Sequence, residues 1–283
     1  MVKLALRILP IYYLTIGGLW LVHLPVVREH LWSFLTFTFN YTIAQYDTNN
    51  SPLNHFWSLC VEEQYYLVWP LLVLGLRKHA RVLLGFAFFF VCLGYVQFHF
   101  NTFASLSKYN FLGILSKMAP LSLGAIGAIW VHLGYQFHAF FNNKITEYAS
   151  IVSIAIAVLI SFEGVYLMMG FMSLYWVLKA SHLEIRSPML RSILTHRFVV
   201  QYGVISYGVY VFHLPIVYYL NIYPYKHYLL PILKPLFAWS PLLADKPWCI
   251  TFPIYFVVYS AFAWASYHFF EKRILSLKSR LKP

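Results

Sequence analysis

The sequence predicts an all-α protein, a polytopic bundle of about eight transmembrane helices. Of its 283 residues 60% are apolar and only 11% are charged, whereas soluble domains average about 25% charged residues. Apolar runs recur along the whole chain, each near the roughly 20 residues that a helix needs to cross about 30 Å of hydrocarbon. The basic residues gather in short clusters between these runs, which is typical of a membrane protein.

Hydropathy places eight predicted spans, which together cover most of the chain. A further apolar stretch, about residues 31–44, contains Asn40 and three threonines. It is short and polar for a span, so we expect it to be interfacial or re-entrant. No low-complexity linker or clear repeat divides the chain, and we treat residues 1–283 as one transmembrane domain. The predicted spans are about 5–25, 57–76, 81–99, 118–134, 147–162, 164–180, 199–221 and 249–270.

The distribution of basic residues supports this topology independently, because eight spans put both termini on the same side of the membrane. Fifteen of the 21 Lys and Arg residues then share one side, which the positive-inside rule identifies as cytoplasmic. We therefore expect a multi-pass protein of the cell membrane with both termini in the cytoplasm. The net charge of +12 needs no nucleic-acid partner, because it is spread between spans. The fifteen residues are Lys3, Arg7, Arg77, Lys78, Arg81, Lys144, Lys179, Arg186, Arg191, Arg197, Lys272, Arg273, Lys278, Arg280 and Lys282.

Cysteine and histidine patterns predict neither a disulfide framework nor a metal site. Cys60, Cys92 and Cys249 lie far apart in apolar surroundings, as buried small hydrophobes do. The twelve His residues are scattered and form no pair with metal-ligand spacing.

The first apolar stretch follows basic residues, as in a signal peptide, but no small-x-small cleavage site comes after it. We therefore expect a retained span there.

The segment NHFWSLCVEEQYYLVWP, residues 54–70, contains two adjacent carboxylates about one turn inside a predicted span. On a helix Ser58, Glu62 and Tyr66 share one face, while Glu63 points about 100° away. Ionised carboxylates inside a membrane are costly unless they are paired or wetted, so a polar cavity opening outward is one interpretation. The alternative places both Glu residues in the headgroup layer, bonded to loop residues such as His55.

A second polar stripe occurs in QYGVISYGVYVFHLP, residues 201–215. Gly203, Ser206, Tyr210 and His213 follow one another at helical spacing and line one face. A mid-span His beside Tyr and Ser suits a proton relay or a substrate pocket. Gly and Ser also allow close helix approach, and a His can link helices by hydrogen bonding. The two interpretations have equal support from the pattern.

Arg7, in LRILPIYYL, is a third candidate. An Arg at the cytoplasmic end of a span can simply fix its orientation. It can also bind phosphate through two parallel hydrogen bonds. The residues considered so far fit an enzyme and a transporter equally well.

Four segments resemble the acyltransferase-3 family of membrane O-acyltransferases, which modify cell-surface glycans and related molecules. WSLCVEEQYYLVWPLL at 57–72 is similar to the family signature W-S-L-x-V-E-E-Q-F-Y-L-x-x-P. LRILPIYYL at 6–14, ISYGVYVFHLPIV at 205–217 and SYHFFEKRI at 266–274 match in the same order. The four segments bracket almost the entire chain, and the first is long and specific.

The resemblance implies transfer of an acyl group, commonly acetyl, from acyl-CoA in the cytoplasm to a sugar or glycan hydroxyl on the far side. Contact with membrane lipid follows from the apolar spans, and the residue spacing predicts no metal. Arg7 matches a cytoplasmic arginine that is a candidate ligand for CoA phosphate. The catalytic candidates are Glu62, Glu63 and His213, and those for substrate binding are Trp57, Ser58, Gln64, Tyr66, Ser206, Tyr207 and Tyr210.

The chain also departs from the family pattern. Members usually carry two more spans ahead of the LRILP segment, with an Arg and the His thought to be the catalytic base. We therefore expect an N-terminally truncated member that is inactive by itself unless His213 supplies the base. Leu4 and Arg273 stand where an arginine and a proline are usual. The alternative hypothesis is a non-catalytic polytopic protein, such as a polysaccharide exporter or a degenerate family remnant.

Overall fold

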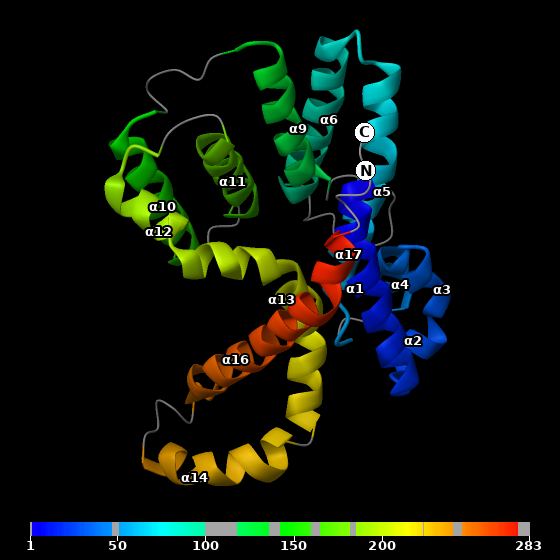
Figure 1. Cartoon of the computed structure of the whole chain (residues 1–283), viewed down its shortest axis with the longest axis vertical. Helices are drawn as coiled ribbons and strands as arrows, with labels where there is room; N and C mark the ends of the chain where they lie inside the picture. The colour runs from blue at the N-terminus through cyan, green and yellow to red at the C-terminus, as the bar shows by residue number, and fades with distance from the viewer. Residues whose placement is uncertain are drawn as a thin grey trace. The chain divides into compact units, whose positions relative to one another are not determined.

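The computed structural model describes residues 2–46, 51–99, 118–135, 142–159, 165–181, 185–222, 224–239 and 245–276. In these ranges the chain is helical and contains no strand, which confirms the all-α fold class (Figure 1). A helix covers most or all of each predicted span. These helices are α1 (Val2–Leu21), α5 (Phe56–Gly75), α6 (Ala80–His99), α9 (Ala119–His132), α10 (Lys144–Leu159), α11 (Val165–Ser181), α13 (Arg197–Ile222) and α16 (Trp248–Ser266).

Two helical segments are long and apolar enough to cross a membrane by length and composition: Arg197–Ile222 and Trp248–Ser276. The second is α16 extended by the π-helix η4 (Tyr267–Glu271) and by α17 (Lys272–Ser276). These two segments support a membrane setting, and the count of eight spans stays a prediction. The remaining elements are α2 (Pro25–Glu29), α3 (Leu31–Leu35), α4 (Phe39–Tyr46), α12 (Pro188–Thr195), the π-helix η3 (Tyr225–Leu229) and α14 (Leu230–Trp239).

The chain forms two compact units. Unit 1 combines Met1–Ile43, Thr48–Phe56 and Arg197–Pro283, so it joins the two ends of the sequence. Unit 2 consists of Ala44–Asp47 and Trp57–His196. The candidate residues therefore fall into two sets, of which Arg7 and the α13 residues belong to unit 1 and the α5 residues to unit 2.

An aromatic core holds the N-terminal part of unit 1 together. Tyr12, Phe34, Phe39 and Phe56 have no exposed surface. The Tyr12 hydroxyl donates to the Phe34 carbonyl oxygen at 2.9 Å, and the rings of Phe34 and Phe39 stack at 4.1 Å. The stretch 31–44 is thus folded onto α1 as two short helices, joined by a turn in which Phe37 has a φ of 53°. Whether this stretch is interfacial or re-entrant stays a prediction.

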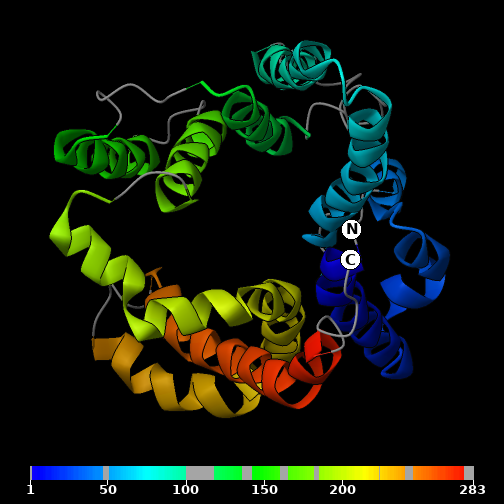
Figure 2. The same ribbon diagram turned by 45° about the horizontal axis from the view of Figure 1, so that its top comes forward.

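Close packing of α13 against α16 builds the rest of unit 1. A Cβ added at Gly208 would lie 3.2 Å from the Ala263 Cβ, so a glycine allows this approach. The two short helices that follow α16, η4 and α17, contact α1. Figure 2 shows this red end of the chain beside the blue N-terminal helix. Residues from both ends of the sequence therefore meet on α13.

In unit 2 the helix that carries the two carboxylates is packed through one apolar side. Val61, Tyr65 and Met118 form a buried cluster, with Tyr66 and Trp69 packed at its margin. The rings of Tyr65 and Trp69 stack at 5.4 Å. Helices α6 and α9, α9 and α11, and α10 and α11 make further contacts in this unit.

Candidate functional site

Polar side chains of α13 tie unit 1 together by hydrogen bonds to distant backbone. The Tyr207 hydroxyl donates to the Ile8 carbonyl oxygen at 3.1 Å, and the Tyr210 hydroxyl donates to the His55 carbonyl oxygen at 2.5 Å. Ser206 is exposed, and its hydroxyl donates to the Gly203 carbonyl oxygen of its own helix at 2.8 Å. The two tyrosines thus link α13 to α1 and to the turn that precedes α5.

His213 lies in a small aromatic and imidazole cluster. Its Nδ1 is 2.6 Å from the Tyr210 carbonyl oxygen. Because a carbonyl oxygen only accepts, Nδ1 carries the proton and Nε2 keeps its lone pair. The His213 ring lies 4.6 Å from the His55 ring and 6.3 Å from the Tyr259 ring. This tautomer leaves His213 with a nitrogen that can accept a proton.

His55 is a member of this cluster that the sequence pattern named only as a loop partner for Glu62 and Glu63. It lies in the turn before α5, and its ring contacts those of Tyr210 and His213. Burial, together with the nearby His213, lowers the pKa of His55 from 6.5 to about 3. His55 is therefore neutral at physiological pH. Its place two residues before Trp57, in a segment rich in polar groups, was the available signal.

A second polar group lies on the same helix pair, at the joint between α16 and η4. Glu271 is buried and accepts a hydrogen bond from the Ser266 hydroxyl at 3.2 Å. A π-helix brings residues five apart onto one face, which explains why these two side chains meet. The exposed Arg7 lies close enough to attract the Glu271 carboxylate. The sequence analysis included Glu271 only as part of the segment at 266–274 and gave it no role of its own. Like His55, it becomes a candidate only in the structure.

In unit 2 the six α5 candidates occupy one continuous helix, so Ser58, Glu62 and Tyr66 share a face as predicted. Glu62 and Glu63 are both half-buried. Within the described residues neither carboxylate makes a hydrogen bond or an ion pair. Half-buried carboxylates of this kind are available for a ligand or for water. The other four candidates differ in exposure: Trp57 is exposed, and Ser58, Gln64 and Tyr66 are half-buried.

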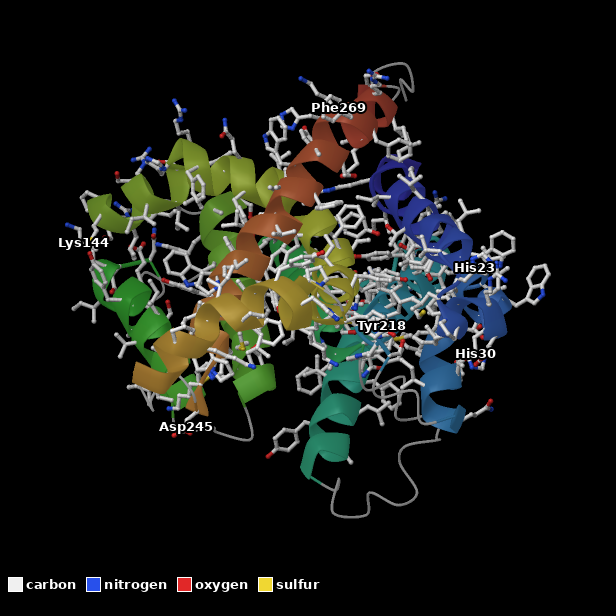
Figure 3. The ribbon with its side chains drawn as sticks, turned by 90° about the horizontal axis from the view of Figure 1, so that it is seen from below. His23, His30, Lys144, Tyr218, Asp245 and Phe269 are labelled. Atoms are coloured by element: carbon white, nitrogen blue, oxygen red, sulfur yellow. The ribbon has the colours of Figure 1, made fainter. Side chains whose placement is uncertain are left out.

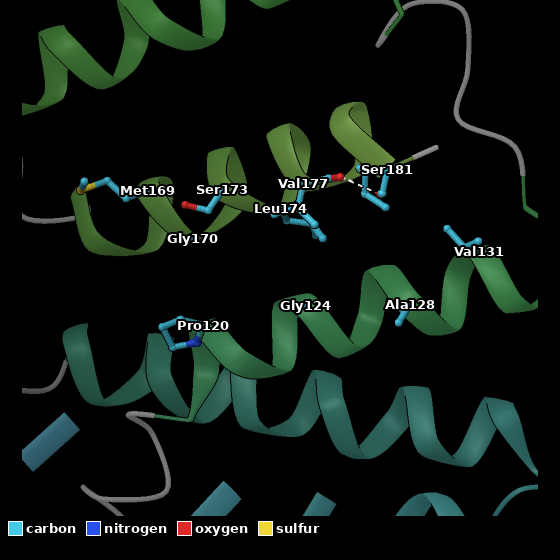
Figure 4. A pocket seen from close by; sticks show the side chains of 11 residues that line it. Pro120, Gly124, Ala128, Val131, Met169, Gly170, Ser173, Leu174, Val177 and Ser181 are labelled. Carbon is cyan, nitrogen blue, oxygen red and sulfur yellow. Dashed lines mark hydrogen bonds between the residues drawn. The ribbon is translucent and has the colours of Figure 1, made fainter. Parts of the chain in front are cut away.

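A groove of about 480 Å³ lies between α9 and α11 in unit 2 (Figure 4). Its walls are mostly apolar, with Pro120, Gly124 and Ala128 on one side and Met169 and Ser173 on the other. None of the predicted site residues lines this groove. The outward-opening polar cavity predicted near Glu62 and Glu63 stays a prediction.

Among the residues that the structure describes, no group of three or more His, Cys, Asp or Glu side chains could hold a metal ion. The chemistry that the described side chains offer is acid–base chemistry at His213, Glu62 and Glu63, and binding of anions at Arg7.

The chain belongs to the acyltransferase-3 family. The sequence model of this family, described as an acyltransferase domain, matches residues 1–268. The match confirms the resemblance drawn from the four ordered segments, and it extends across both units.

Two relatives from Staphylococcus aureus illustrate the similarity. The O-acetyltransferase OatA of strain NCTC 8325 / PS 47 is 28% identical over 191 residues, which are 61% of this chain and 30% of that protein. A putative O-acetyltransferase of strain COL is 26% identical over 196 residues, 61% of this chain and 31% of that protein. The chain thus spans less than a third of the length of the curated relatives it matches. No solved structure matches it.

Proposed function

We propose that this protein is a membrane O-acyltransferase that moves an acyl group, commonly acetyl, from acyl-CoA to a hydroxyl of a cell-surface sugar or glycan. The observation that carries the proposal is the family match over residues 1–268. The names of the relatives support acetyl as the group and oxygen as the acceptor atom. The two long apolar helical segments support a location in a membrane.

In this reaction the acceptor oxygen attacks the thioester carbonyl carbon. A new C–O bond forms, the C–S bond breaks, the hydroxyl proton passes to a base and the CoA thiolate takes up a proton. His213 is our candidate base, because the bond from Nδ1 to the Tyr210 carbonyl leaves Nε2 unprotonated. A positioned base of this kind contributes roughly 10²–10⁴-fold to the rate.

Tyr207 and Tyr210 support this site in two ways. Their bonds to the Ile8 and His55 carbonyls fix α13 against the neighbouring segments of unit 1. A tyrosine hydroxyl oxygen accepts hydrogen bonds as well as donating them, and we propose these two side chains as contacts for the sugar. Within unit 2, Glu62 and Glu63 are our candidates for accepting a proton or a hydrogen bond from a hydroxyl group.

Arg7 is our candidate for the donor. Its guanidinium is exposed on α1, and a guanidinium matches the phosphate groups of CoA through paired hydrogen bonds. The Glu271 carboxylate is close enough to attract this guanidinium. Arg7→Lys keeps the positive charge but cannot make the paired hydrogen bonds. It therefore separates the contribution of charge to CoA binding from that of the paired hydrogen bonds.

The test is the amount of alkali-labile acetate on the surface polysaccharide of a host that lacks O-acetyltransferases of its own. We expect the chain to raise this amount, and His213→Ala to abolish the increase at equal membrane abundance. His79→Ala is the matched control, since His79 is exposed in the turn before α6. An unchanged acetate level with the chain abundant in the membrane would contradict the proposed function. Full activity in His213→Ala would remove His213 as the base.

A further inference from the structure

Three segments of unit 2 meet at a buried ion pair between Glu147 and Lys179. The Lys179 Nζ lies 2.7 Å from the Glu147 Oε1, and both side chains have no exposed surface. The two carboxylate oxygens also accept the backbone N–H groups of Arg186 and Ser187, at 2.7 and 2.8 Å. This arrangement, which we call the carboxylate clamp, fixes the start of α10, the end of α11 and the chain entering α12 in one place.

Helix α12 is built directly on the carboxylate clamp. Ser187 is its N-cap, and the Ser187 hydroxyl oxygen accepts the Leu190 N–H at 3.3 Å. The Tyr148 hydroxyl of α10 hydrogen-bonds the same Ser187 hydroxyl at 2.6 Å. A helix of two turns is too short to be stable by itself in water. The position of α12 is therefore set by the clamp and by the burial of Leu190.

Helix α12 has one apolar and one polar side. At about 100° per residue, four apolar residues cover an arc of roughly 140°, and Arg191, Ser192 and Thr195 lie on the other side. The four are Met189, Leu190, Ile193 and Leu194. Of the apolar set only Leu190 is buried. Met189, Ile193 and Leu194 are 63%, 47% and 41% exposed. An apolar stripe thus faces outward beside a polar face.

Basic residues lie next to this stripe along the chain, and another one begins α10, three residues before Glu147. Arg186 and Arg191 are exposed, and no acidic residue occurs between residues 186 and 197. Lys144 at the start of α10 is exposed and extends away from the ribbon (Figure 3). An exposed apolar stripe with basic residues at its edges matches the boundary between acyl chains and anionic headgroups.

We propose that α12 lies in the cytoplasmic surface of the membrane, with Met189, Ile193 and Leu194 among acyl chains. Arg186 and Arg191 bind the phosphates of anionic phospholipids there. The carboxylate clamp gives the reason for this occupant. Helices α10 and α11 correspond to two predicted spans, and α10 begins at the clamp while α11 ends at it. The clamp therefore holds α12 at one end of both spans, which is where a membrane surface would lie. The proposal needs those two spans and is independent of the proposed reaction.

The first test measures depth with a bimane probe on the full chain, in which Cys92 and Cys249 are replaced by Ser and Cys60 is left buried. Ile193→Cys places the probe on the apolar stripe, and Ser192→Cys is the matched control on the polar side. In vesicles of phosphatidylcholine and phosphatidylglycerol, we expect brominated acyl chains to quench the Ile193 probe several-fold more than the Ser192 probe. Aqueous iodide should show the opposite order.

Equal quenching of both probes by iodide would overturn the proposal, since α12 would then lie in water. An Ile193 probe protected from both quenchers would also overturn it, because protein would cover the stripe. Size-exclusion chromatography of each labelled variant checks that it is folded. Neither outcome depends on acyl transfer, so failure here is distinct from failure of the proposed function.

The second test addresses the headgroup. Brominated phosphatidylglycerol should quench the Ile193 probe roughly two- to fivefold more than brominated phosphatidylcholine at equal mole fraction. Arg191→Gln should reduce this preference, while Arg77→Gln, an exposed basic residue in the turn before α6, should leave it unchanged. Equal quenching by both lipids in the parent chain would remove the anionic phospholipid from the proposal.

Discussion

His55 shows how a single residue in a turn acquires a special environment. Its ring contacts two side chains of α13, and its carbonyl accepts the Tyr210 hydroxyl. A charge on His55 would be poorly solvated and would face His213, which explains the lowered pKa of the imidazole. Because His55 is neutral, it packs against the His213 ring without placing a second positive charge beside it.

The pKa of His55 predicts a pH-dependent stability. The unfolded chain binds the proton near pH 6.5, and the folded chain only near about 3. The contribution of His55 is thus complete above pH 6.5 and declines as the pH falls toward 3. We expect the melting temperature in detergent to fall less between pH 7 and 5 in His55→Gln than in the wild type. Identical pH profiles would show that His55 titrates normally.

Glu62 and Glu63 are neighbours in sequence with different directions on α5. Because Glu62 shares a face with Ser58 and Tyr66, we expect Glu62→Gln to lower acyl transfer more than Glu63→Gln, at unchanged membrane abundance. The measurement is surface acetate normalised to the amount of protein. Normal activity with lower abundance in both variants would instead support a structural role in the headgroup layer.

At the scale of elements, two devices join helices that are distant in sequence. In unit 1 the π-helix η4 turns Glu271 toward Ser266 and the α13 glycine Gly208. In unit 2 the carboxylate clamp joins α10, α11 and α12. In both places a carboxylate is buried, and its hydrogen bonds or ion pair offset the cost of removing it from water.

The carboxylate clamp predicts strongly coupled substitutions. Glu147→Gln and Lys179→Met each leave the other charge buried without its partner, which costs about 3 kcal/mol of stability. The double variant should lose less than the sum of the single ones, because no unpaired charge remains. Thermal unfolding in detergent measures this, with the exposed Lys144→Gln as control. Additive losses would mean that the two side chains act separately.

At the scale of the whole molecule, the distribution of Lys and Arg predicts the membrane topology. The prediction places the Arg77–Arg81 turn and the C-terminal tail in the cytoplasm, with fifteen of 21 basic residues on that side. Single cysteines introduced at Lys78 and Lys278 should resist an impermeant thiol reagent in intact cells and react after permeabilisation. Labelling of the tail in intact cells would contradict the eight-span topology.

The sequence by itself determined the fold class, the positions of the long helices and the family. Hydropathy is a sum over a local window, so the positions of α1, α5, α13 and α16 could be predicted without knowing their neighbours. The face shared by Ser58, Glu62 and Tyr66 also follows from helix geometry alone. The family signature is local too, because it occupies consecutive residues of α5.

Only the tertiary structure decided which polar groups meet. His55 and His213 come from a turn and a helix far apart in the chain, and Glu147 reaches Lys179 and the backbone of Ser187 across three elements. Ser266 and Glu271 are close in sequence, yet an ordinary α-helical spacing does not bring them together and the π-helix does. Hydropathy and helical period describe each helix alone, whereas these contacts depend on which helix faces pack together.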